Sequence, residues 1–463
     1  MVAEPLYTEA PPRRLPLFAL YTANAVSQTG DMLMFLAIPW FVLQTTGSVA
    51  QTGITTFFTF ASVGLSALFG SAFIDRLGFQ RASVVSDLAS MLGVALIPLL
   101  YATVGLPFWA LLALVFLAGL LTTPGQTARY ALVPDLAQLA HARIERVTAA
   151  KDSVTRLSRF VGAPLAGVLI VIIGTSNLLW IDAATFAVSA LVIGVAVPVK
   201  MPVRLPGQLP AETRAAASSA SRTEPEVSLP TPDESDHTLG AGAVDTSRRA
   251  KRSAGYLSGL REGVAFIWRD RVLRDTTLVV LLTNALDTGQ SGVLAPAFVK
   301  QMYGNAVILG AMIAAFGGAA FAGTIVFGAI GHKLSRRLAL GLGFTLGGGS
   351  RYFWIVLLAP APVAMVASQA LCGFCIGPVN PLFSTLDYER VPVALRARVF
   401  GVLTAGSMLG APLGGLLAGA VAPVIGVEPS MLFFGVIYSL ATLSLLVNPA
   451  LRELDTRRAS SLA

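Results

Sequence analysis

The sequence predicts an all-α membrane protein of about twelve transmembrane helices. Its residues are 54% hydrophobic and only 13% charged, whereas a soluble domain usually carries about 25% charged residues. The hydrophobic residues form long uninterrupted blocks, as membrane-spanning helices of roughly 20 residues require. Strands of a membrane barrel would instead give alternating segments of about ten residues. We therefore expect lipid to be the solvent for most of this chain.

The hydrophobic blocks fall into two sets that are separated by a polar stretch. The first set covers residues 16–43, 50–73, 82–104, 107–128, 155–174 and 177–198, and the second covers 275–299, 306–331, 337–359, 361–385, 399–425 and 429–448. These limits divide the chain into an N-terminal half over residues 1–199, a linker over 200–255, and a C-terminal region over 256–463. The linker is rich in Pro, Ser and Ala, which is typical of disorder. The C-terminal region is expected to begin with an interfacial helix and to end in a cytoplasmic tail.

Basic residues gather in every second loop between the predicted spans. Members of this set include Arg76, Arg81, Arg129, Arg143, Arg146, Arg336, Arg337, Arg390, Arg396 and Arg398. The alternate loops hold few charges beyond Lys300 and Glu428. Because cytoplasmic loops of membrane proteins carry the excess of Lys and Arg, both termini are predicted to be cytoplasmic.

The net charge of +8 is explained by this topology signal, so we expect no nucleic-acid partner. A basic cluster at the end of the linker permits contact with anionic membrane lipids, or it is a further part of the topology signal. This cluster consists of Arg248, Arg249, Lys251 and Arg252.

Catalytic and metal-binding patterns are not apparent in the sequence. Cys372 and Cys375 lie inside a hydrophobic block and are interpreted as small core residues. The glycine-rich run over residues 341–349 is not followed by the Gly-Lys-Ser/Thr of a phosphate loop, so it predicts close helix packing. The histidines are scattered over polar segments. We therefore expect neither a cofactor nor a metal, and the protein is not predicted to be an enzyme.

An internal repeat relates the two sets of spans. The segment from Gly162 through Pro164 to Gly167 in the fifth span recurs as Gly410, Pro412 and Gly415 in the eleventh span. Polar stripes also run along the first and seventh spans, and they contain Asn24, Ser27, Gln28, Asp31 and Asn284, Asp287, Thr288, Ser291. Because such stripes are costly against lipid, they are expected to face the interior of a bundle or an aqueous cavity.

The loop after the second span resembles the signature of the major facilitator superfamily. It contains Asp75, Arg76, Gly78 and Arg81 at the family spacing, although Ser71 replaces the first glycine. The resemblance covers nearly all of the chain except the linker and tails. It implies the family fold of two pseudo-symmetric halves, each of about six helices, and a cytoplasmic gate at this loop. Asp87 is grouped with this gate, and we expect it to form a structural ion pair near Arg76 and Arg81.

Further segments resemble the macrolide-efflux and siderophore-exporter type of drug:proton antiporter. They are Gly30-Asp31 with Ile38-Pro39-Trp40, then Ile181-Asp182-Ala183-Ala184-Thr185-Phe186, then Leu260-Arg261-Glu262-Gly263, and the fifth-span motif of Gly162, Pro164 and Gly167. The arginine that many drug antiporters carry within the fourth helix is replaced by the segment Leu117-Ala118-Gly119.

This resemblance implies a monomeric, multi-pass exporter in the cell membrane. It would move a hydrophobic or amphipathic, drug-like small molecule out of the cell by alternating access, in exchange for protons. Its cavity would include Asn24, Gln28, Trp40, Asn284 and Asn380. One alternative is an exporter dedicated to a single metabolite such as a siderophore or lipid. The other alternative is a membrane sensor without transport activity.

Ionisable residues at membrane depth are functional candidates, because their burial is costly. Asp31 is the leading proton-coupling candidate and Asp287 is the second; a structural, hydrogen-bonded carboxylate is the alternative for Asp31. Asp182 lies near the outer end of the sixth span, where it is interpreted as an interfacial residue. Arg351 either attracts an anionic substrate or pairs with a carboxylate.

Overall fold

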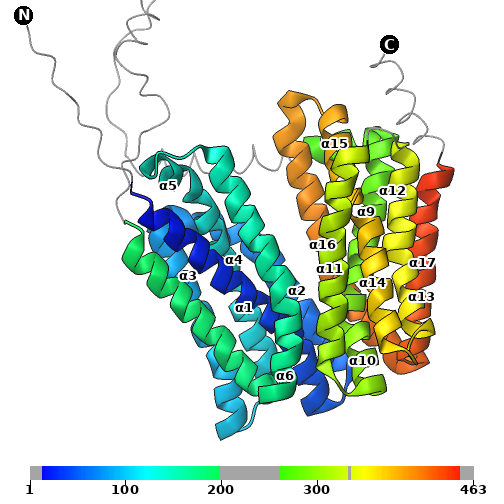
Figure 1. Ribbon diagram of the computed structural model, residues 1–463, viewed down its shortest axis with the longest axis horizontal. Helices are drawn as coiled ribbons and strands as arrows, with labels where there is room; N and C mark the ends of the chain where they lie inside the picture. Colours follow the sequence, from blue (N-terminus) through cyan, green and yellow to red (C-terminus); the bar gives the residue numbers. More distant parts are fainter. Residues whose placement is uncertain (1–12, 199–260, 332–334, 449–463) are drawn as a thin grey trace, which may run out of the picture. The chain divides into compact units, whose positions relative to one another are not determined.

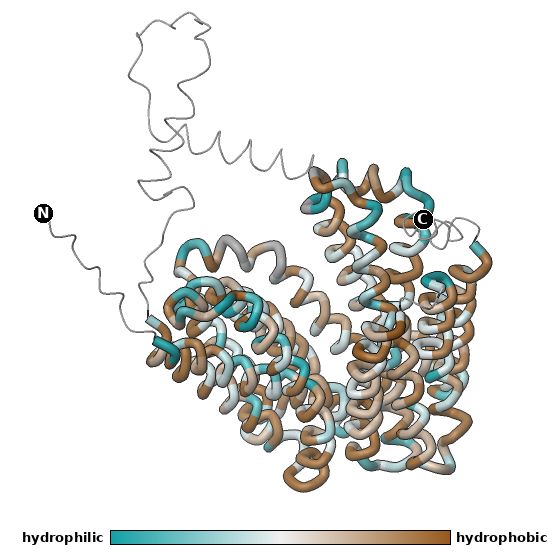
Figure 2. Tube along the Cα trace, turned by 45° about the horizontal axis from the view of Figure 1, so that its top comes forward, coloured by the Kyte–Doolittle hydropathy of each residue, from teal (hydrophilic) through white to brown (hydrophobic). Residues whose placement is uncertain are grey.

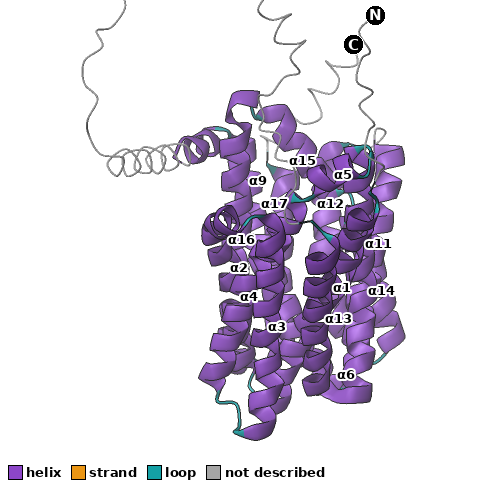
Figure 3. Cartoon of the chain, turned by 90° about the vertical axis from the view of Figure 1, so that its left-hand side faces the viewer, coloured by secondary structure: helices purple, strands orange, loops and turns teal. Residues whose placement is uncertain are grey.

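A computed structural model describes residues 13–198, 261–331 and 335–448. The predicted linker over 200–255 lies outside the described residues, as do the basic cluster at its end and the C-terminal tail. Within the described ranges the regular structure is helical, and Figure 3 shows these helices joined by short loops without a strand among them.

The helices of the N-terminal half follow the predicted spans closely. They are α1 (Leu15–Thr46), α2 (Val49–Leu77), α3 (Phe79–Thr103), α4 (Phe108–Ala131), the short α5 (Val133–Leu139) and α6 (Ile144–Ala196). The long α6 contains two predicted spans, because Gly174 has a non-helical backbone with φ of 81° and kinks the helix between them. A left-handed φ of this kind favours glycine, which lacks the Cβ atom that would clash.

The helices of the C-terminal half are more often interrupted. They are α9 (Arg271–Gly289), the π-helical η2 (Gln290–Leu294), α10 (Ala295–Tyr303), α11 (Ala306–Ile330), α12 (Arg336–Phe344), the π-helical η4 (Thr345–Gly349), α13 (Ser350–Leu357), α14 (Pro362–Ile376), α15 (Val379–Arg390), the 3₁₀ turn η5 (Val393–Leu395), α16 (Arg396–Ile425) and α17 (Val427–Val447). The break between α14 and α15 falls at Gly377 and Pro378, where proline removes a helical hydrogen bond.

The predicted number of spans is recovered from these elements. In the described part of the chain, nine helices are long and hydrophobic enough to cross a membrane, and α6 is counted once among them. Dividing α6 at Gly174 and adding α2 and the run α12–η4–α13 gives the twelve spans expected from the sequence. Large hydrophobic side chains also point outward, including Phe69, Ile172, Leu191 and Leu409, as a lipid solvent requires. Figure 2 shows the corresponding dominance of hydrophobic residues along the helices.

The two halves use the same helix pairings. In the N-terminal half α1 packs along α6, and in the C-terminal half the corresponding α9 packs along α16. The pairs α2 with α4 and α3 with α6 likewise correspond to α11 with α14 and α13 with α17 (Figure 1). Between the halves, α2 packs against α16 and α6 packs against α11, which are again equivalent pairs under the repeat.

The two halves contact each other near the end of the molecule that contains the α1–α2 and α16–α17 connections. A methyl group on Gly53 of α2 would lie 2.6 Å from the carbonyl oxygen of Gly415 in α16. Thr56 donates a hydrogen bond of 3.2 Å to the carbonyl of Gly292, and Lys300 donates to the carbonyl of Leu43. The two halves are therefore joined by close backbone approach and by hydrogen bonds at this end.

Candidate functional site

The polar stripe of α1 faces other helices of its own half. Asn24 donates a hydrogen bond of 2.8 Å to Thr155, and the Gln28 carbonyl accepts one of 3.2 Å from Arg159; both partners lie on α6. Asn24 and Gln28 are buried, with 2% and 4% of their surface exposed. The stripe is thus placed in the interior, as expected for polar groups on a membrane-spanning helix.

Asp87 of α3 forms a fully buried ion pair with Arg129 of α4. The Arg129 Nη1 atom lies 2.9 Å from Oδ1 and 2.7 Å from Oδ2 of Asp87, and both side chains are 0% exposed. Ser189 donates to Asp87 over 2.6 Å, and the Arg129 Nη2 atom donates to Ser27 over 3.1 Å. This pair therefore connects four helical segments of the N-terminal half.

This geometry corrects two expectations. Asp87 was expected to pair near Arg76 and Arg81, but its partner is Arg129, and both of the loop arginines are exposed. Arg129 was assigned to a loop, yet it lies within α4, which extends to Ala131. Thus α4 does carry an arginine, further along the helix than Leu117-Ala118-Gly119. The carboxylate and two hydroxyls accept hydrogen bonds from the two Nη atoms, which offsets the cost of burial, whereas the Nε atom has no partner among the described residues.

Asp31 lies beside this ion pair on α1. It accepts a hydrogen bond of 2.7 Å from the Gln126 side chain of α4, and it is partly exposed. Arg129 and Arg159 both contact α1 nearby, where they donate to Ser27 and Gln28, about one helical turn before Asp31. Asp31 forms no ion pair with any residue that the structure describes.

Asp182 is a buried residue of α6, which corrects its interpretation as an interfacial residue. Its exposed fraction is 0%, because α1 approaches α6 very closely at Gly30. A methyl group on Gly30 would lie 2.5 Å from Oδ1 of Asp182 and 2.1 Å from the Thr185 hydroxyl. Glycine at position 30 thus permits the approach that encloses this carboxyl group.

The C-terminal half contains a second charge pair, in which the arginine side chain is 9% exposed and the aspartate side chain is 34% exposed. Arg351 of α13 donates to Asp287 of α9, and the Tyr352 hydroxyl lies 3.4 Å from the same carboxylate oxygen. The Arg351 guanidinium lies 5.0 Å from the centre of the Phe316 ring, which favours a cation–π contact. Of the two alternatives for Arg351, the structure contains the carboxylate pair. Both partners lie beside π-helical segments, η2 and η4, and such segments often occur at functional sites.

The remaining cavity candidates have different environments. Asn284 donates a hydrogen bond of 3.2 Å to the carbonyl of Ser407, whereas Asn380 is exposed. Trp40 is only 2% exposed and belongs to the hydrophobic core, so it does not line a cavity in this conformation. An indole ring inside a close-packed core gains more from burial than from contact with an aqueous space.

The residues of the signature loop are exposed. Asp75, Arg76 and Arg81 make no hydrogen bond or ion pair with another residue in the described ranges. Gly78 has a φ of 78° and joins the end of α2 to the start of α3, a turn that favours glycine. The cytoplasmic gate that the resemblance implies at this loop is thus without a side-chain hydrogen bond or ion pair in the described part of this conformation.

The Gly/Pro motif is a packing device in both halves. Methyl groups on Gly162 and Gly410 would lie 2.8 Å from Met32 of α1 and 2.5 Å from the Leu281 carbonyl of α9, respectively. Gly167 approaches α11 in the same way, because a methyl group on Gly167 would lie 2.7 Å from the carbonyl oxygen of Ala306. Pro164 and Pro412 lie inside α6 and α16. The motif therefore brings the backbones of neighbouring helices close together.

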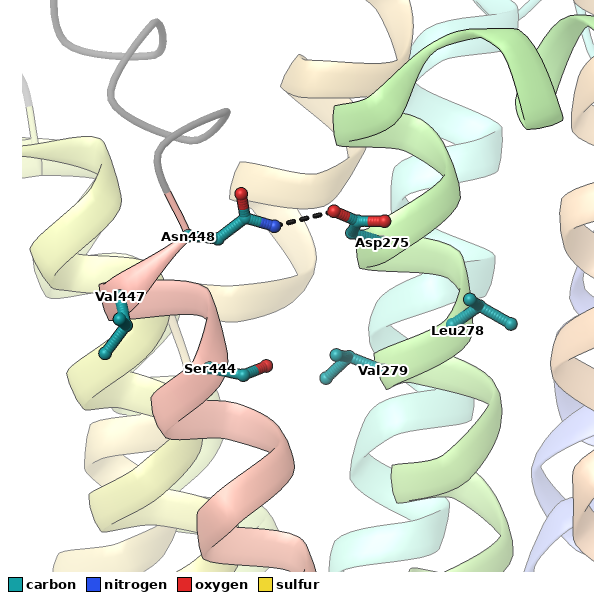
Figure 4. Close-up of a pocket in the computed structure, with 6 residues that line it drawn as sticks. All are labelled: Asp275, Leu278, Val279, Ser444, Val447 and Asn448. Atoms are coloured by element: carbon teal, nitrogen blue, oxygen red, sulfur yellow. Dashed lines mark hydrogen bonds between the residues drawn. The ribbon is translucent and has the colours of Figure 1, made fainter.

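A cavity of about 440 Å³ lies between α9 and α17 (Figure 4). Its lining residues are Asp275, Leu278, Val279, Ser444, Val447 and Asn448. The Asn448 amide donates a hydrogen bond of 2.6 Å to Asp275. None of the predicted cavity residues belongs to this lining.

Sequence reasoning missed Gln126, Arg129, Arg159 and Asp182 as parts of the site. Gln126 and Arg129 follow Thr122 at the spacing of one helix face. This polar spacing could have been used to extend the predicted fourth span beyond residue 128. Arg159 lies inside α6, within the predicted fifth span, but no partner was predicted for it from the sequence. No group of His, Cys, Asp and Glu in the described residues could hold a metal ion.

Comparison with known proteins identifies the family. Residues 20–386 and 276–461 match the model of the Major Facilitator Superfamily. The multidrug efflux pump Tap of Mycobacterium tuberculosis is 28% identical over 446 residues, which cover 96% of this chain and 95% of the relative. The pump Tap of Mycolicibacterium fortuitum is 28% identical over 458 residues, with 97% and 98% covered.

Solved structures share the fold at low sequence identity. The peptide transporter POT in complex with sulfate has a TM-score of 0.66 at 14% identity, with 95% of each chain covered. The nucleoside transporter NupG has a TM-score of 0.65 at 13% identity, covering 93% of this chain and 99% of that chain. These matches confirm the predicted fold class, and this chain belongs to the major facilitator superfamily as a multi-pass membrane transporter rather than an enzyme.

Proposed function

We propose that this protein exports hydrophobic or amphipathic, drug-like molecules across the cell membrane in exchange for protons. The observation that carries the proposal is the environment of Asp31, a carboxyl group at membrane depth without an ion-pair partner among the described residues. Ionisable groups at this depth mark proton relays and substrate paths. The hydrogen bond from Gln126 fixes the orientation of the Asp31 carboxyl group. Asp31 is partly exposed, which lets protons reach its carboxyl group.

The substrate class and the direction of transport are supported by similarity over nearly the whole chain. Relatives named multidrug efflux pumps align with 96% and 97% of this sequence. Asn24, Gln28 and Asn284 are cavity candidates in this proposal, while Asp287 and Arg351 supply a charge pair in the opposite half. A few polar groups within a largely hydrophobic lining suit an amphipathic substrate.

Alternating access and the cytoplasmic gate are further parts of the proposal. The described contacts between the halves lie at the end near Gly53 and Gly415, opposite to the loop of Asp75 and Arg81. We place that loop and both termini in the cytoplasm, following the distribution of basic residues. In the alternative conformation Asp75 would approach the N-terminal end of α16, where the helix dipole favours a negative charge. The transporter is proposed to act as a monomer surrounded by membrane lipids.

The proposal is tested by transport in proteoliposomes with and without an imposed pH gradient. Ethidium, a lipophilic cation, serves as the probe, and the wild type is compared with Asp31→Asn. Asp152→Asn is the matched control, because Asp152 is an exposed carboxylate on α6. Gradient-driven flux is expected in the wild type and the control. It is expected to be lost in Asp31→Asn, while the variant keeps a monodisperse elution profile.

Three outcomes contradict the proposal. Equal gradient-driven flux in Asp31→Asn and wild type removes Asp31 from the mechanism and directs attention to Asp287. Wild-type flux that ignores the pH gradient rejects proton exchange. Absence of flux for ethidium and for an uncharged hydrophobic dye favours an exporter dedicated to one metabolite, or a sensor.

A further inference from the structure

Asp182 is the most completely enclosed carboxyl group in the described part of the transporter that lacks a cationic partner. Its exposed fraction is 0%, and its Oδ2 atom is buried without a hydrogen-bond partner among the described residues. The Thr185 hydroxyl lies 3.4 Å from its other oxygen, but it donates chiefly to the backbone carbonyl of Asp182, over 2.7 Å. This environment differs from that of Asp87, which is equally buried but accepts short bonds from a guanidinium and a hydroxyl.

The absence of partners determines the charge state of Asp182 in this conformation. An ionised carboxylate that is removed from water without a partner is so costly that the group takes up a proton instead. A neutral carboxylic acid has a much smaller desolvation cost, so it can be buried with only a weak polar contact to one side chain. The enclosure of Asp182 therefore favours its uncharged form.

Asp31 strengthens this conclusion from the neighbouring helix. The Asp182 carboxyl group contacts the backbone position of Gly30, which directly precedes Asp31. Arg129 and Arg159 donate to Ser27 and Gln28, about one helical turn before Asp31 on α1, whereas Asp182 forms no ion pair with a described residue. Of the two carboxyl groups, the partly exposed Asp31 is therefore the one that ionises at the lower desolvation cost.

We propose that Asp182 is a second proton-binding residue of the transport cycle, protonated in this conformation and paired with an ionised Asp31. The inference rests on the proposed proton exchange for its role in transport. Gly30 is the positioning residue, because only a residue without a side chain admits the Asp182 carboxyl group at this point.

The proton balance of the pair is simple. In the enclosed state Asp182 holds one proton and Asp31 holds one negative charge. When the alternative conformation admits water to α6, the O–H bond of Asp182 breaks and the proton passes to water. The resulting carboxylate is then stabilised by hydration. Enclosure on return to the present conformation requires that a proton be taken up again.

Infrared spectroscopy tests the protonation state without any reference to transport. Purified full-length protein in detergent is compared with Asp182→Asn, with Asp31→Asn and with Asp152→Asn as the exposed control on the same helix. The carbonyl stretch of a buried, protonated carboxylic acid is expected in the wild type at neutral pH. It should be lost in Asp182→Asn and kept in both other variants. Because Asn has the shape of the neutral acid, the variant is expected to fold.

Transport measurements then test the role of Asp182. Ethidium exchange without a gradient is expected to persist in Asp182→Asn, whereas pH-driven accumulation should fall to the level of protein-free vesicles. If Asp182→Asn keeps the acid band, or keeps full pH-driven accumulation, the inference is wrong. If the wild type shows the acid band but its flux ignores pH, the proposed proton exchange fails while the protonated state of Asp182 stands.

Thr185→Val provides a second variant in case Asp182→Asn does not fold. It removes the hydroxyl that lies 3.4 Å from the Asp182 Oδ1 atom but leaves the carboxyl group in place. The acid band should therefore persist and shift to a higher frequency. An unshifted band in this variant would place the protonated acid elsewhere in the protein and overturn the assignment.

Discussion

The Asp87–Arg129 pair gives the sharpest test of the structure of the N-terminal half. In Arg129→Met the buried Asp87 carboxylate loses both guanidinium bonds, of 2.9 and 2.7 Å. Both contacts come from the single Nη1 nitrogen, so they are counted as one shared hydrogen bond to a charged group, worth about 1.5–3 kcal/mol. The variant also leaves the carboxylate buried without its cation, and removing one partner of a buried ion pair costs about 3–5 kcal/mol. Arg129→Met should therefore lower the free energy of unfolding by several kcal/mol.

A double variant and a surface pair provide the controls. Asp87→Leu combined with Arg129→Met should recover most of the loss, because hydrophobic replacement of a whole buried pair is often neutral. The pair of Arg336 and Glu389 has the same N–O distance of 2.7 Å as the buried pair, but its side chains are 29% and 46% exposed. Glu389→Gln should therefore cost at most about 1 kcal/mol.

Equilibrium unfolding in mixed detergent micelles, followed by tryptophan fluorescence, measures these differences. If Arg129→Met and Glu389→Gln destabilise the protein equally, the Asp87–Arg129 pair is hydrated in solution. A double variant that is no more stable than Arg129→Met would show that the loss comes from packing rather than from an unpaired charge.

Two further predictions follow from packing and from a buried cation. A methyl group on Gly414 would lie 1.7 Å from the carbonyl oxygen of Ala285, so Gly414→Ala should cost about 1–3 kcal/mol or more. Gly406→Ala on the same helix is the control, because a methyl group there would have no described atom within 4 Å, and it should be neutral or slightly stabilising. Similar unfolding midpoints of the two variants would contradict the close approach of α9 and α16. Lys151 is 1% exposed and lies over the Tyr130 ring, and its Nζ atom has no hydrogen-bond partner among the residues that the structure describes. Lys151→Met should therefore raise the unfolding midpoint, and a lowered midpoint would mean that the cation–π contact outweighs the cost of burying the charge.

The spans were predictable because their hydrophobic period and length are local properties. Lipid offers no partner to the backbone, so each block of sufficient length must form a helix. The internal repeat, the signature loop with Gly78 and the interior position of Asn24 and Gln28 also followed from residue spacing. The predicted C-terminal end of the fourth span was too early. The charged Arg129 was taken as the limit of the span, whereas α4 extends to Ala131.

The polar network required the tertiary structure, because its bonds join residues far apart in the chain. Arg129 looks like a topology signal in sequence, and only the proximity of Asp87, Ser27 and Ser189 makes its burial possible. Asp182 likewise becomes a candidate proton site only through the close approach of Gly30. The sequence by itself determined which segments lie in the membrane and which faces of them are polar. Tertiary packing decided which of those polar groups meet, because burial and partner choice, rather than residue type, set the charge state of each one.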